Sequence, residues 1–235
     1  LGQEAYIPNF FCKAYRPVLY IPSKEEVKEL LQKMDIHTSH NSEQFRLDRE
    51  CKILFLLYFC CGLRLSEGRL LKWEHIDLDK GILTGLGSKG NKDRLVYLPQ
   101  DSLPVLKNYK ERQEMLFPGI DWAFPGKDPH KPVSCSGVES SFNRHWAMLP
   151  VARTVDKHPT PHCLRHAFVV ERFNEWMHQG IDTNTMLPYL SRYLGHKSPD
   201  ETYYYYQLVE KAFDTIREKD SVSGKVIPEV LPYEE

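Results

Sequence analysis

Several basic side chains in this sequence have the types and spacing of a phosphate-binding site. Arg64, Arg165 and His196 each stand beside the start of a predicted helix, where unpaired backbone N–H groups and the positive end of the helix dipole favour an anion. His162 precedes Arg165 by three residues, which places both on one helix face. Taken singly, such residues are more often ordinary surface residues of helix ends.

Zinc is a second chemistry to weigh, because His158, His162 and His166 are spaced by four. Pro159 and Pro161 prevent the first pair of histidines from sharing a helix. No nearby carboxylate or thiolate completes an obvious ligand set. The pattern therefore favours phosphate over metal.

A basic hairpin and a tyrosine cluster add to the candidate site. The runs Gly81–Gly87 and Arg94–Leu98 flank a turn-forming cluster, which predicts a β-hairpin with Lys89 at its tip. The four consecutive tyrosines Tyr203–Tyr206 fall in a helix predicted to start at Pro199. Successive helical residues turn by about 100°, so at most one ring can face a phosphate squarely.

The order of these pieces resembles the tyrosine recombinase (phage integrase) family. Each piece is weak, but the ordered set is specific and covers roughly residues 21–209. The segments that carry the resemblance are Cys61–Glu67, Gly87–Arg94, His162–His166, Leu194–His196 and Thr202–Tyr205. The resemblance implies a mainly α catalytic domain with a small antiparallel β-sheet (α+β), which agrees with the elements predicted from the residues.

The resemblance also implies a nucleophile and a chemistry. By the family spacing the nucleophile is Tyr205, with Tyr204 as the second choice. Its phenol oxygen would attack a DNA phosphodiester and store the backbone as a 3′-phosphotyrosine ester, which a 5′ hydroxyl can reverse. The resemblance thus implies strand cleavage and rejoining with no cofactor, neither metal nor ATP.

The remaining site residues take roles by the same resemblance. Arg64, Arg165 and His196 would stabilise charge on the non-bridging phosphate oxygens. Lys89 would protonate the leaving 5′ oxygen. His162 would assist proton transfer from the tyrosine or hold the phosphate. Glu67 would orient neighbouring side chains.

Helix signals predict the elements that must position these residues. A capping box at Ser23 and Glu26 opens the first helix. Gly62 ends the second helix, and Thr160-Pro161 caps a later one. The predicted helices after the first span Glu43–Leu63, Ser66–Trp73, Val138–Leu149, Pro161–Met177 and Asn184–Leu194, and Pro118–Pro132 is predicted to be a surface loop.

Composition places the chain among ordinary globular proteins. Its 235 residues are 41% hydrophobic and 27% charged, which excludes a disordered chain. The formal net charge of −1 does not indicate a class of binding partner. The charge is uneven, because residues 199–235 hold nine acids against four bases, a net charge of −5, and the rest of the chain has a net charge of +4. The longest apolar run, Ile53–Leu63, is short of the roughly 20 residues that span a bilayer. Six cysteines without a C-x-x-C pair indicate reduced thiols.

We expect three segments along the chain. Residues 1–22 form a linker or arm from an N-terminal DNA-binding domain, residues 23–219 the catalytic domain, and residues 220–235 a tail. The tail either docks on a neighbouring protomer or covers its own core. The expected partner is double-stranded DNA. We expect four protomers to assemble on the DNA and the protein to be a monomer or weak oligomer without it. The expected location is the cytoplasm, bacterial or phage-associated, with no membrane partner.

Other functions fit parts of the same pattern. A type IB topoisomerase uses the same chemistry without sequence-specific synapsis. A non-catalytic DNA-binding module would keep the fold but not turnover. A zinc hydrolase would use the histidines spaced by four.

Overall fold

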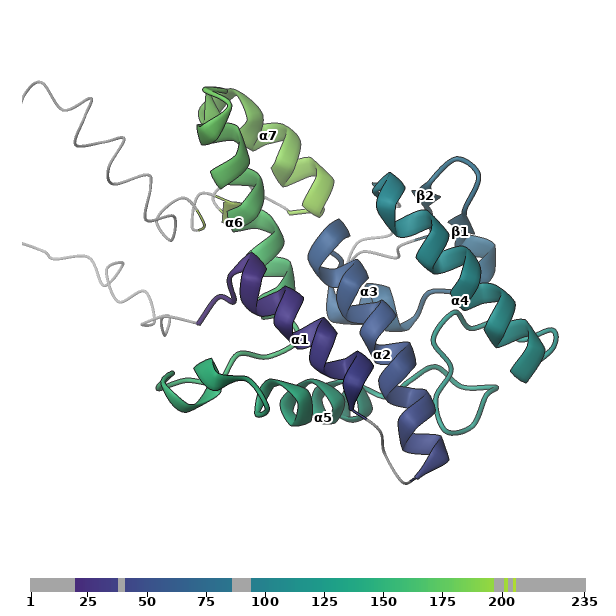
Figure 1. Cartoon of the computed structure of the whole chain (residues 1–235). Coiled ribbons are helices and arrows are strands. Elements are labelled where there is room, and N and C mark those ends of the chain that lie inside the picture. The colour runs from purple at the N-terminus through teal and green to yellow at the C-terminus, as the bar shows by residue number, and fades with distance from the viewer. Residues whose placement is uncertain (1–19, 38–40, 86–93, 197–200, 203–204, 206–235) are drawn as a thin grey trace, which may run out of the picture.

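Helices packed around one central helix make up most of the molecule (Figure 1). The computed structural model describes residues 20–37, 41–85, 94–196, 201–202 and 205. The central helix, α2, packs against α1, α5 and α6. The helices are α1 (Lys24–Ile36), α2 (Ser42–Cys61), α3 (Leu65–Arg69), α4 (Leu103–Leu116), α5 (Cys135–Trp146), α6 (Cys163–His178) and α7 (Thr183–Leu194). The prediction of a mainly α fold with a small antiparallel sheet is confirmed.

The predicted ends of the first two helices are confirmed. Ser23 caps α1 by accepting a hydrogen bond from the backbone N–H of Glu26, whose side chain in turn accepts one from the backbone of Ser23. Gly62 ends α2 in the left-handed conformation, with a φ of 62°. A residue without Cβ is suited to that conformation, which turns the chain sharply after the helix.

A small sheet stands beside this helical body. Its strands β1 (Ile76–Asp77), β2 (Ile82–Leu83) and β3 (Val96–Tyr97) are antiparallel in the order β1-β2-β3. The pairing of β2 with β3 confirms the predicted hairpin. Strand β1 was not predicted, because two residues carry too little periodicity to signal a strand. The hairpin tip with Lys89 lies outside the described residues.

Two predicted helix boundaries are wrong. The helix predicted to run to Trp73 ends at Arg69, because the backbone groups of Leu71 and Trp73 bond instead to the loop at residues 121–123. The helix predicted to start at Pro161 starts at Cys163. There the backbone N–H of Cys163 donates to the carbonyl of Thr160, so residues 160–163 form a turn before the helix.

The later elements follow the remaining predictions closely. The segment Pro118–Pro132 is a loop, and α5 and α7 match the predicted helices within a few residues. Gly195 ends α7 with a φ of 66°, repeating the left-handed end of α2. Residues 201, 202 and 205 are helical, as expected for the segment after Pro199. None of the helices among the described residues is long and apolar enough to cross a membrane.

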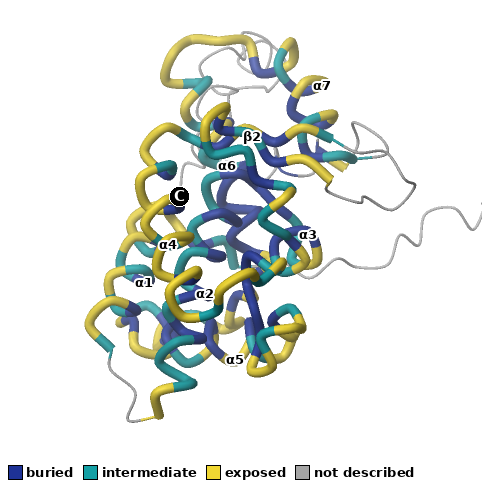
Figure 2. Tube along the Cα trace, turned by 90° about the vertical axis from the view of Figure 1, so that its right-hand side faces the viewer, coloured by how far each residue is buried: buried dark blue, intermediate teal, exposed yellow. Residues whose placement is uncertain are grey.

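The core consists of two hydrophobic clusters. One is formed mainly by α1, α2, α4, α5 and the sheet, and the other by α6, α7 and Tyr205. Figure 2 shows the buried residues gathered between the helices, with the outer turns of α1, α4 and α5 exposed. Tyr193 packs against both clusters, and its hydroxyl donates to the carbonyl of Cys61 over 3.1 Å. The seam between the clusters therefore lies where α2 and α7 end.

We predict that Gly62→Ala destabilises the protein by about 2–3 kcal/mol. Alanine at this position would have to keep the positive φ, which costs about 1–2 kcal/mol. Its Cβ would also lie 2.5 Å from Cδ1 of Phe168. Gly119→Ala is the control, because Gly119 has a φ of 72° with no atom within 4 Å of the added Cβ. Urea unfolding of both variants measures the difference, and equal losses would contradict the close contact at Gly62.

Candidate active site

The carbonyls at the ends of α2 and α7 anchor a buried arginine. Arg165 projects from the first turn of α6 and is 2% exposed. Its guanidinium donates to the carbonyl of Gly62 over 2.6 Å and to the carbonyl of Leu194 over 2.9 Å. The negative end of a helix dipole favours a cation at both places. Two helix ends far apart in the sequence therefore fix one guanidinium.

Arg64 joins this group from the start of α3. Its guanidinium donates to the carbonyl of Gly195 over 2.6 Å and to the Glu67 carboxylate over 2.9 Å. The backbone N–H of Arg64 also donates to Glu67, over 2.7 Å. The side chain of Arg64 remains 30% exposed, so it is the most accessible of the clustered arginines.

A third arginine, Arg94, completes the group and was not assigned a role from the sequence. It donates to the carbonyl of Leu194 and, over 2.8 Å, to Glu67. Burial, together with the charge of Arg64, lowers the pKa of Arg94, while Glu67 raises it. Arg94 is the last residue of Gly87–Arg94, one of the segments that carry the family resemblance. Its place in that segment was the signal from which a role could have been predicted.

Glu67 is the carboxylate that holds the three arginines together. Its side chain is 2% exposed and contacts Arg64, Arg94 and, at 3.9 Å, Arg165. Burial and the neighbouring arginines lower the pKa of Arg165 to about 10, so it stays charged at neutral pH. Three guanidiniums against one carboxylate leave a surplus of positive charge at the seam. Such a cluster favours a bound anion and disfavours a metal cation.

His196 lies against this cluster in its neutral form. Its Nε2 is 3.1 Å from Nη2 of Arg165, and its Nδ1 is 2.7 Å from the hydroxyl of Thr202. Because a guanidinium only donates, Nε2 accepts and the ring hydrogen resides on Nδ1. Burial and the nearby arginines lower the pKa of His196 to about 3.

Tyr205 lies beside the cluster with its hydroxyl on a histidine. The residue is 5% exposed, and its hydroxyl is 2.7 Å from Nδ1 of His166. Its ring is parallel to that of His196, with centroids 6.4 Å apart. Burial and its charged neighbours lower the pKa of His166 to about 4. A neutral His166 with its hydrogen on Nε2 accepts the phenol hydrogen.

His162 lies against His166, which in turn contacts Tyr205. The two imidazole rings meet edge to face with centroids 4.7 Å apart. Burial, then Arg165 and Arg64, lower the pKa of His162. Sequence reasoning weighed His166 only as a zinc ligand and missed its contact with Tyr205. The position of His166 directly after Arg165 did not indicate that contact. The contact depends on where the tertiary structure places Tyr205.

The structure thus brings most of the predicted site residues together. They are Arg64, Glu67, His162, Arg165, His196 and Tyr205. Lys89 and Tyr204 lie outside the described residues. His158 is exposed, and among the described residues the three histidines spaced by four are not a group of mutually close ligand atoms.

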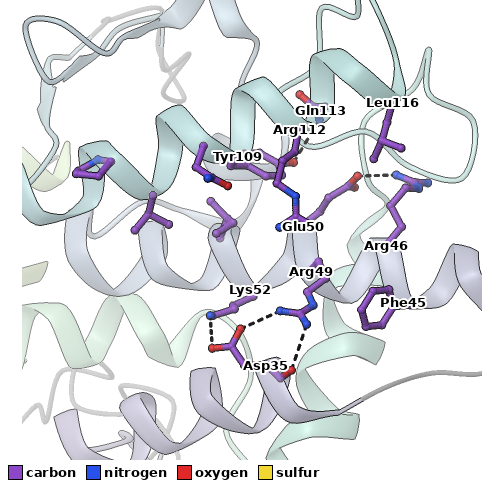
Figure 3. Close-up of a pocket in the computed structure, with 14 residues that line it drawn as sticks. Asp35, Phe45, Arg46, Arg49, Glu50, Lys52, Tyr109, Arg112, Gln113 and Leu116 are labelled. Carbon is purple, nitrogen blue, oxygen red and sulfur yellow. Dashed lines mark hydrogen bonds and ion pairs between the residues drawn. The ribbon is translucent and has the colours of Figure 1, made fainter.

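A separate basic hollow lies between α2 and α4 (Figure 3). It has a volume of about 540 Å³, and Arg46, Arg49 and Arg112 are among its lining residues. Arg46 pairs with the buried Glu50 over 2.7 Å, and burial raises the pKa of Glu50 to about 7. No residue of the cationic cluster lines this hollow. The candidate active site is therefore the cluster at the ends of α2 and α7.

The sequence model of the Phage integrase family matches residues 23–212, a range that contains the whole cluster. The chain belongs to the phage integrase family. It is 32% identical to tyrosine recombinase XerA of Pyrococcus furiosus over 191 residues, which cover 80% of this chain and 57% of that protein. It is 34% identical to tyrosine recombinase XerC of Alcanivorax borkumensis over 150 residues, which cover 63% of this chain and 46% of that protein.

Solved structures share the fold of this phage integrase family member. The crystal structure of XerA recombinase aligns with a TM-score of 0.63 at 21% identity, covering 87% of this chain and 65% of that one. XerH recombinase, in a post-cleavage complex with its palindromic difH substrate, aligns with a TM-score of 0.63 at 20% identity, covering 85% and 52%. The chain spans about half the length of the two curated relatives named above.

We predict that Glu67→Gln lowers the free energy of unfolding by about 3 kcal/mol. The substitution keeps the shape of the side chain but leaves the half-buried Arg64 and the buried Arg94 and Arg165 without their shared counter-charge. Glu175→Gln is the matched control, since its pair with Arg172 is exposed and is expected to cost less than about 0.5 kcal/mol. Urea unfolding measures both, and a small effect at Glu67 would show that the carbonyls alone hold the cluster.

We predict that stability falls as the pH drops from 6.5 toward 4, partly because of His166. Its pKa is depressed in the folded state, so below pH 6.5 the unfolded chain binds a proton that the folded chain does not. In His166→Gln, the loss of stability between pH 7 and pH 5 should shrink by about 2 kcal/mol. His158→Gln, at an exposed position, should leave the loss unchanged. Urea titrations at each pH give the slopes, and parallel slopes for wild type and His166→Gln would refute the prediction.

Proposed function

We propose that this chain is the catalytic domain of a site-specific DNA recombinase or integrase that works through a 3′-phosphotyrosine intermediate, without metal or ATP. The observation that carries the proposal is the meeting of Arg64, Arg94 and Arg165 at the end of α7, beside Tyr205. Membership of the phage integrase family supports it independently.

The cationic cluster suits a phosphodiester. Its guanidiniums are held by protein groups before any ligand arrives, so little reorganisation is needed when charge develops on the non-bridging oxygens. The exposed part of Arg64 gives an anion direct access to the cluster. Donors fixed in this way stabilise the transition state where a metal ion acts in other enzymes.

The contact between Tyr205 and His166 supports a path for the proton. The phenol oxygen forms a bond to phosphorus while the bond from phosphorus to the 5′ oxygen breaks. The phenol proton passes to Nδ1 of His166, 2.7 Å away, which a neutral ring can accept. Lys89 then protonates the leaving 5′ oxygen, the role that the family resemblance implies. His162, whose ring meets that of His166 edge to face, assists the transfer.

His196 is poised to change its protonation when a phosphate binds. The three arginines that depress its pKa are the groups that an anion would neutralise. A phosphate beside them therefore raises the pKa of His196 toward its ordinary value. The ring then donates from Nε2 to a phosphate oxygen, which it cannot do while that atom accepts from Arg165.

The partner in this proposal is double-stranded DNA. The XerH structure contains difH DNA, and an integrase of the Tn1549 transposon was solved with circular-intermediate DNA. We infer that four protomers assemble on two duplexes, each contributing one tyrosine. In this proposal residues 1–22 lead from a DNA-clamping domain, residues 23–219 form the catalytic domain, and residues 220–235 dock on a neighbouring protomer.

A nicked suicide duplex tests the nucleophile. The duplex carries the protein's own site, recovered by binding selection from random DNA, and is incubated with protein in buffer free of Mg²⁺ and ATP. We expect wild type to form an adduct that survives denaturant, Tyr205→Phe to form none, and Tyr204→Phe to form as much as wild type. Mass spectrometry of the trapped peptide identifies the attacking residue.

Two further variants test the role of Arg165 in the same assay. Arg165→Lys should slow adduct formation by about 10²–10³-fold, because lysine cannot bridge two carbonyls and a phosphate. Arg172→Lys on the same helix, at an exposed position, should not. An adduct that persists in Tyr205→Phe, or none in wild type, would overturn the proposal. Relaxation of supercoils without site preference would favour a topoisomerase.

A further inference from the structure

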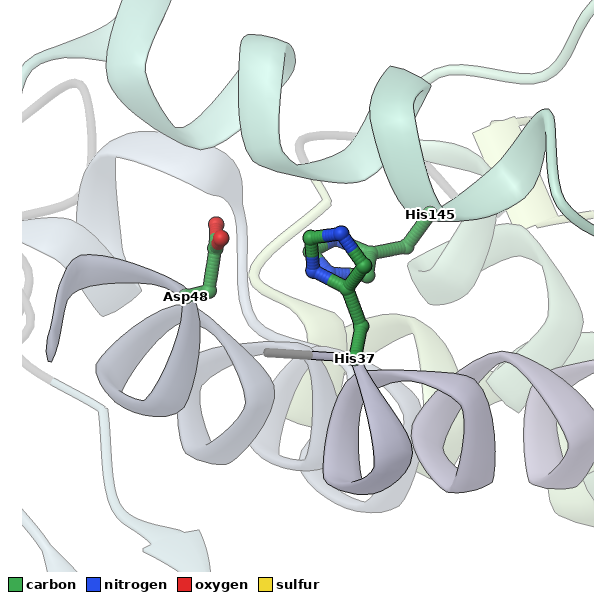
Figure 4. Close-up of side chains that lie close together, drawn as sticks. All are labelled: His37, Asp48 and His145. Atoms are coloured by element: carbon green, nitrogen blue, oxygen red, sulfur yellow. The ribbon is translucent and has the colours of Figure 1, made fainter. Parts of the chain in front are cut away.

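Three side chains outside the cationic cluster meet where α1, α2 and α5 come together (Figure 4). His37 caps the C-terminal end of α1, Asp48 projects from α2, and His145 projects from the last turn of α5. One ligand atom of each residue lies within 4.8 Å of the others. The two imidazole rings are 5.2 Å apart between centroids and nearly perpendicular.

Each of the three residues buries a polar atom without a hydrogen-bond partner. Among the described residues, these atoms include Nδ1 of His37, Oδ2 of Asp48 and Nε2 of His145. Asp48 is 3% exposed and His145 is fully buried. A buried polar group without a hydrogen-bond partner destabilises the fold. Three such atoms, one on each residue of a group that could hold a metal ion, therefore indicate a missing electrophilic partner.

The other polar atoms of His145 and Asp48 are already bonded to protein. Nδ1 of His145 is 2.8 Å from the carbonyl of Ser141, which can only accept, so the lone pair lies on Nε2. Oδ1 of Asp48 accepts from Ser141 over 2.7 Å, Arg144 over 2.9 Å and Gln44 over 3.2 Å. Oδ2 is left free. Metal ligands in proteins are commonly fixed in this way by hydrogen bonds to their second polar atom.

We propose that His37, Asp48 and His145 bind a Zn²⁺ ion that stabilises the folded chain. Two imidazole nitrogens and one carboxylate oxygen match the ligand types that Zn²⁺ takes, with water as the fourth ligand. Ligand atoms on a tetrahedral Zn²⁺ lie roughly 3.3 Å apart, so the ion draws the three side chains closer together. His37 follows the last residue of α1, where its ring can move without breaking the helix.

This inference goes beyond the proposed recombinase function and does not depend on it. The ion would tie together three helices of the first hydrophobic cluster and would not touch the reacting phosphate. Binding to the folded chain alone stabilises it in proportion to the logarithm of ligand concentration over Kd. The two proposals are tested by different measurements, and either can fail while the other holds.

Metal content and stability of the full chain test the site. The protein is stripped with chelator, dialysed against Zn²⁺, and analysed by elemental mass spectrometry and thermal unfolding. We expect one Zn²⁺ per chain and a rise in Tm of about 5–10 °C at a concentration 100-fold above Kd. Co²⁺ in place of Zn²⁺ should give the visible absorption of a tetrahedral site.

Variants separate this site from adventitious binding. His37→Gln and His145→Gln should each lose the bound metal and the rise in Tm, whereas His130→Gln, at an exposed position, should keep both. His37 lies at a half-buried helix end, and circular dichroism checks that its variant folds. The proposal is overturned if wild type binds no stoichiometric metal and shows no rise in Tm, or if His37→Gln binds as wild type does.

Discussion

One buried carboxylate makes the candidate active site possible. Three guanidiniums that share one carboxylate repel one another, and burial adds to the cost of the charges on Arg94 and Arg165. Glu67 offsets that repulsion by contacting all three, and the carbonyls that end α2 and α7 accept most of their remaining hydrogen bonds. The cluster is thus stable as a cation before any phosphate arrives, which is the condition for stabilising charge in a transition state.

Two glycines set the geometry of this anchor. Gly62 and Gly195 end their helices in the left-handed conformation, where a side chain would be strained and would collide with Phe168 or Arg94. The sharp turns bring the last carbonyls of both helices to the seam between the two hydrophobic clusters. Tyr193 packs across the same seam, so the packing that joins the clusters also fixes the arginines.

The histidines fall into two electrostatic environments. Burial, and after it the nearby positive charge, lowers the pKa values of His162, His166 and His196, which favours their neutral forms. That surplus of positive charge repels a divalent cation. In the proposed metal site, His37 and His145 instead lie near the unpartnered Oδ2 of Asp48, whose Oδ1 pairs with Arg144. The same residue type is thereby suited to phosphate chemistry in one place and to metal binding in another.

The sequence by itself determined the features that depend on a few neighbouring residues. The cap at Ser23, the glycine ends at Gly62 and Gly195, the hairpin strands and the mainly α class follow from local patterns, as does the order of motifs that resembles the family. Only the tertiary structure placed Arg94 on Glu67, His166 on Tyr205, and Asp48 near two histidines. It also ended α3 early, at the loop that pairs with Leu71. These contacts join residues tens of positions apart, and no local periodicity encodes which distant surfaces will pack together.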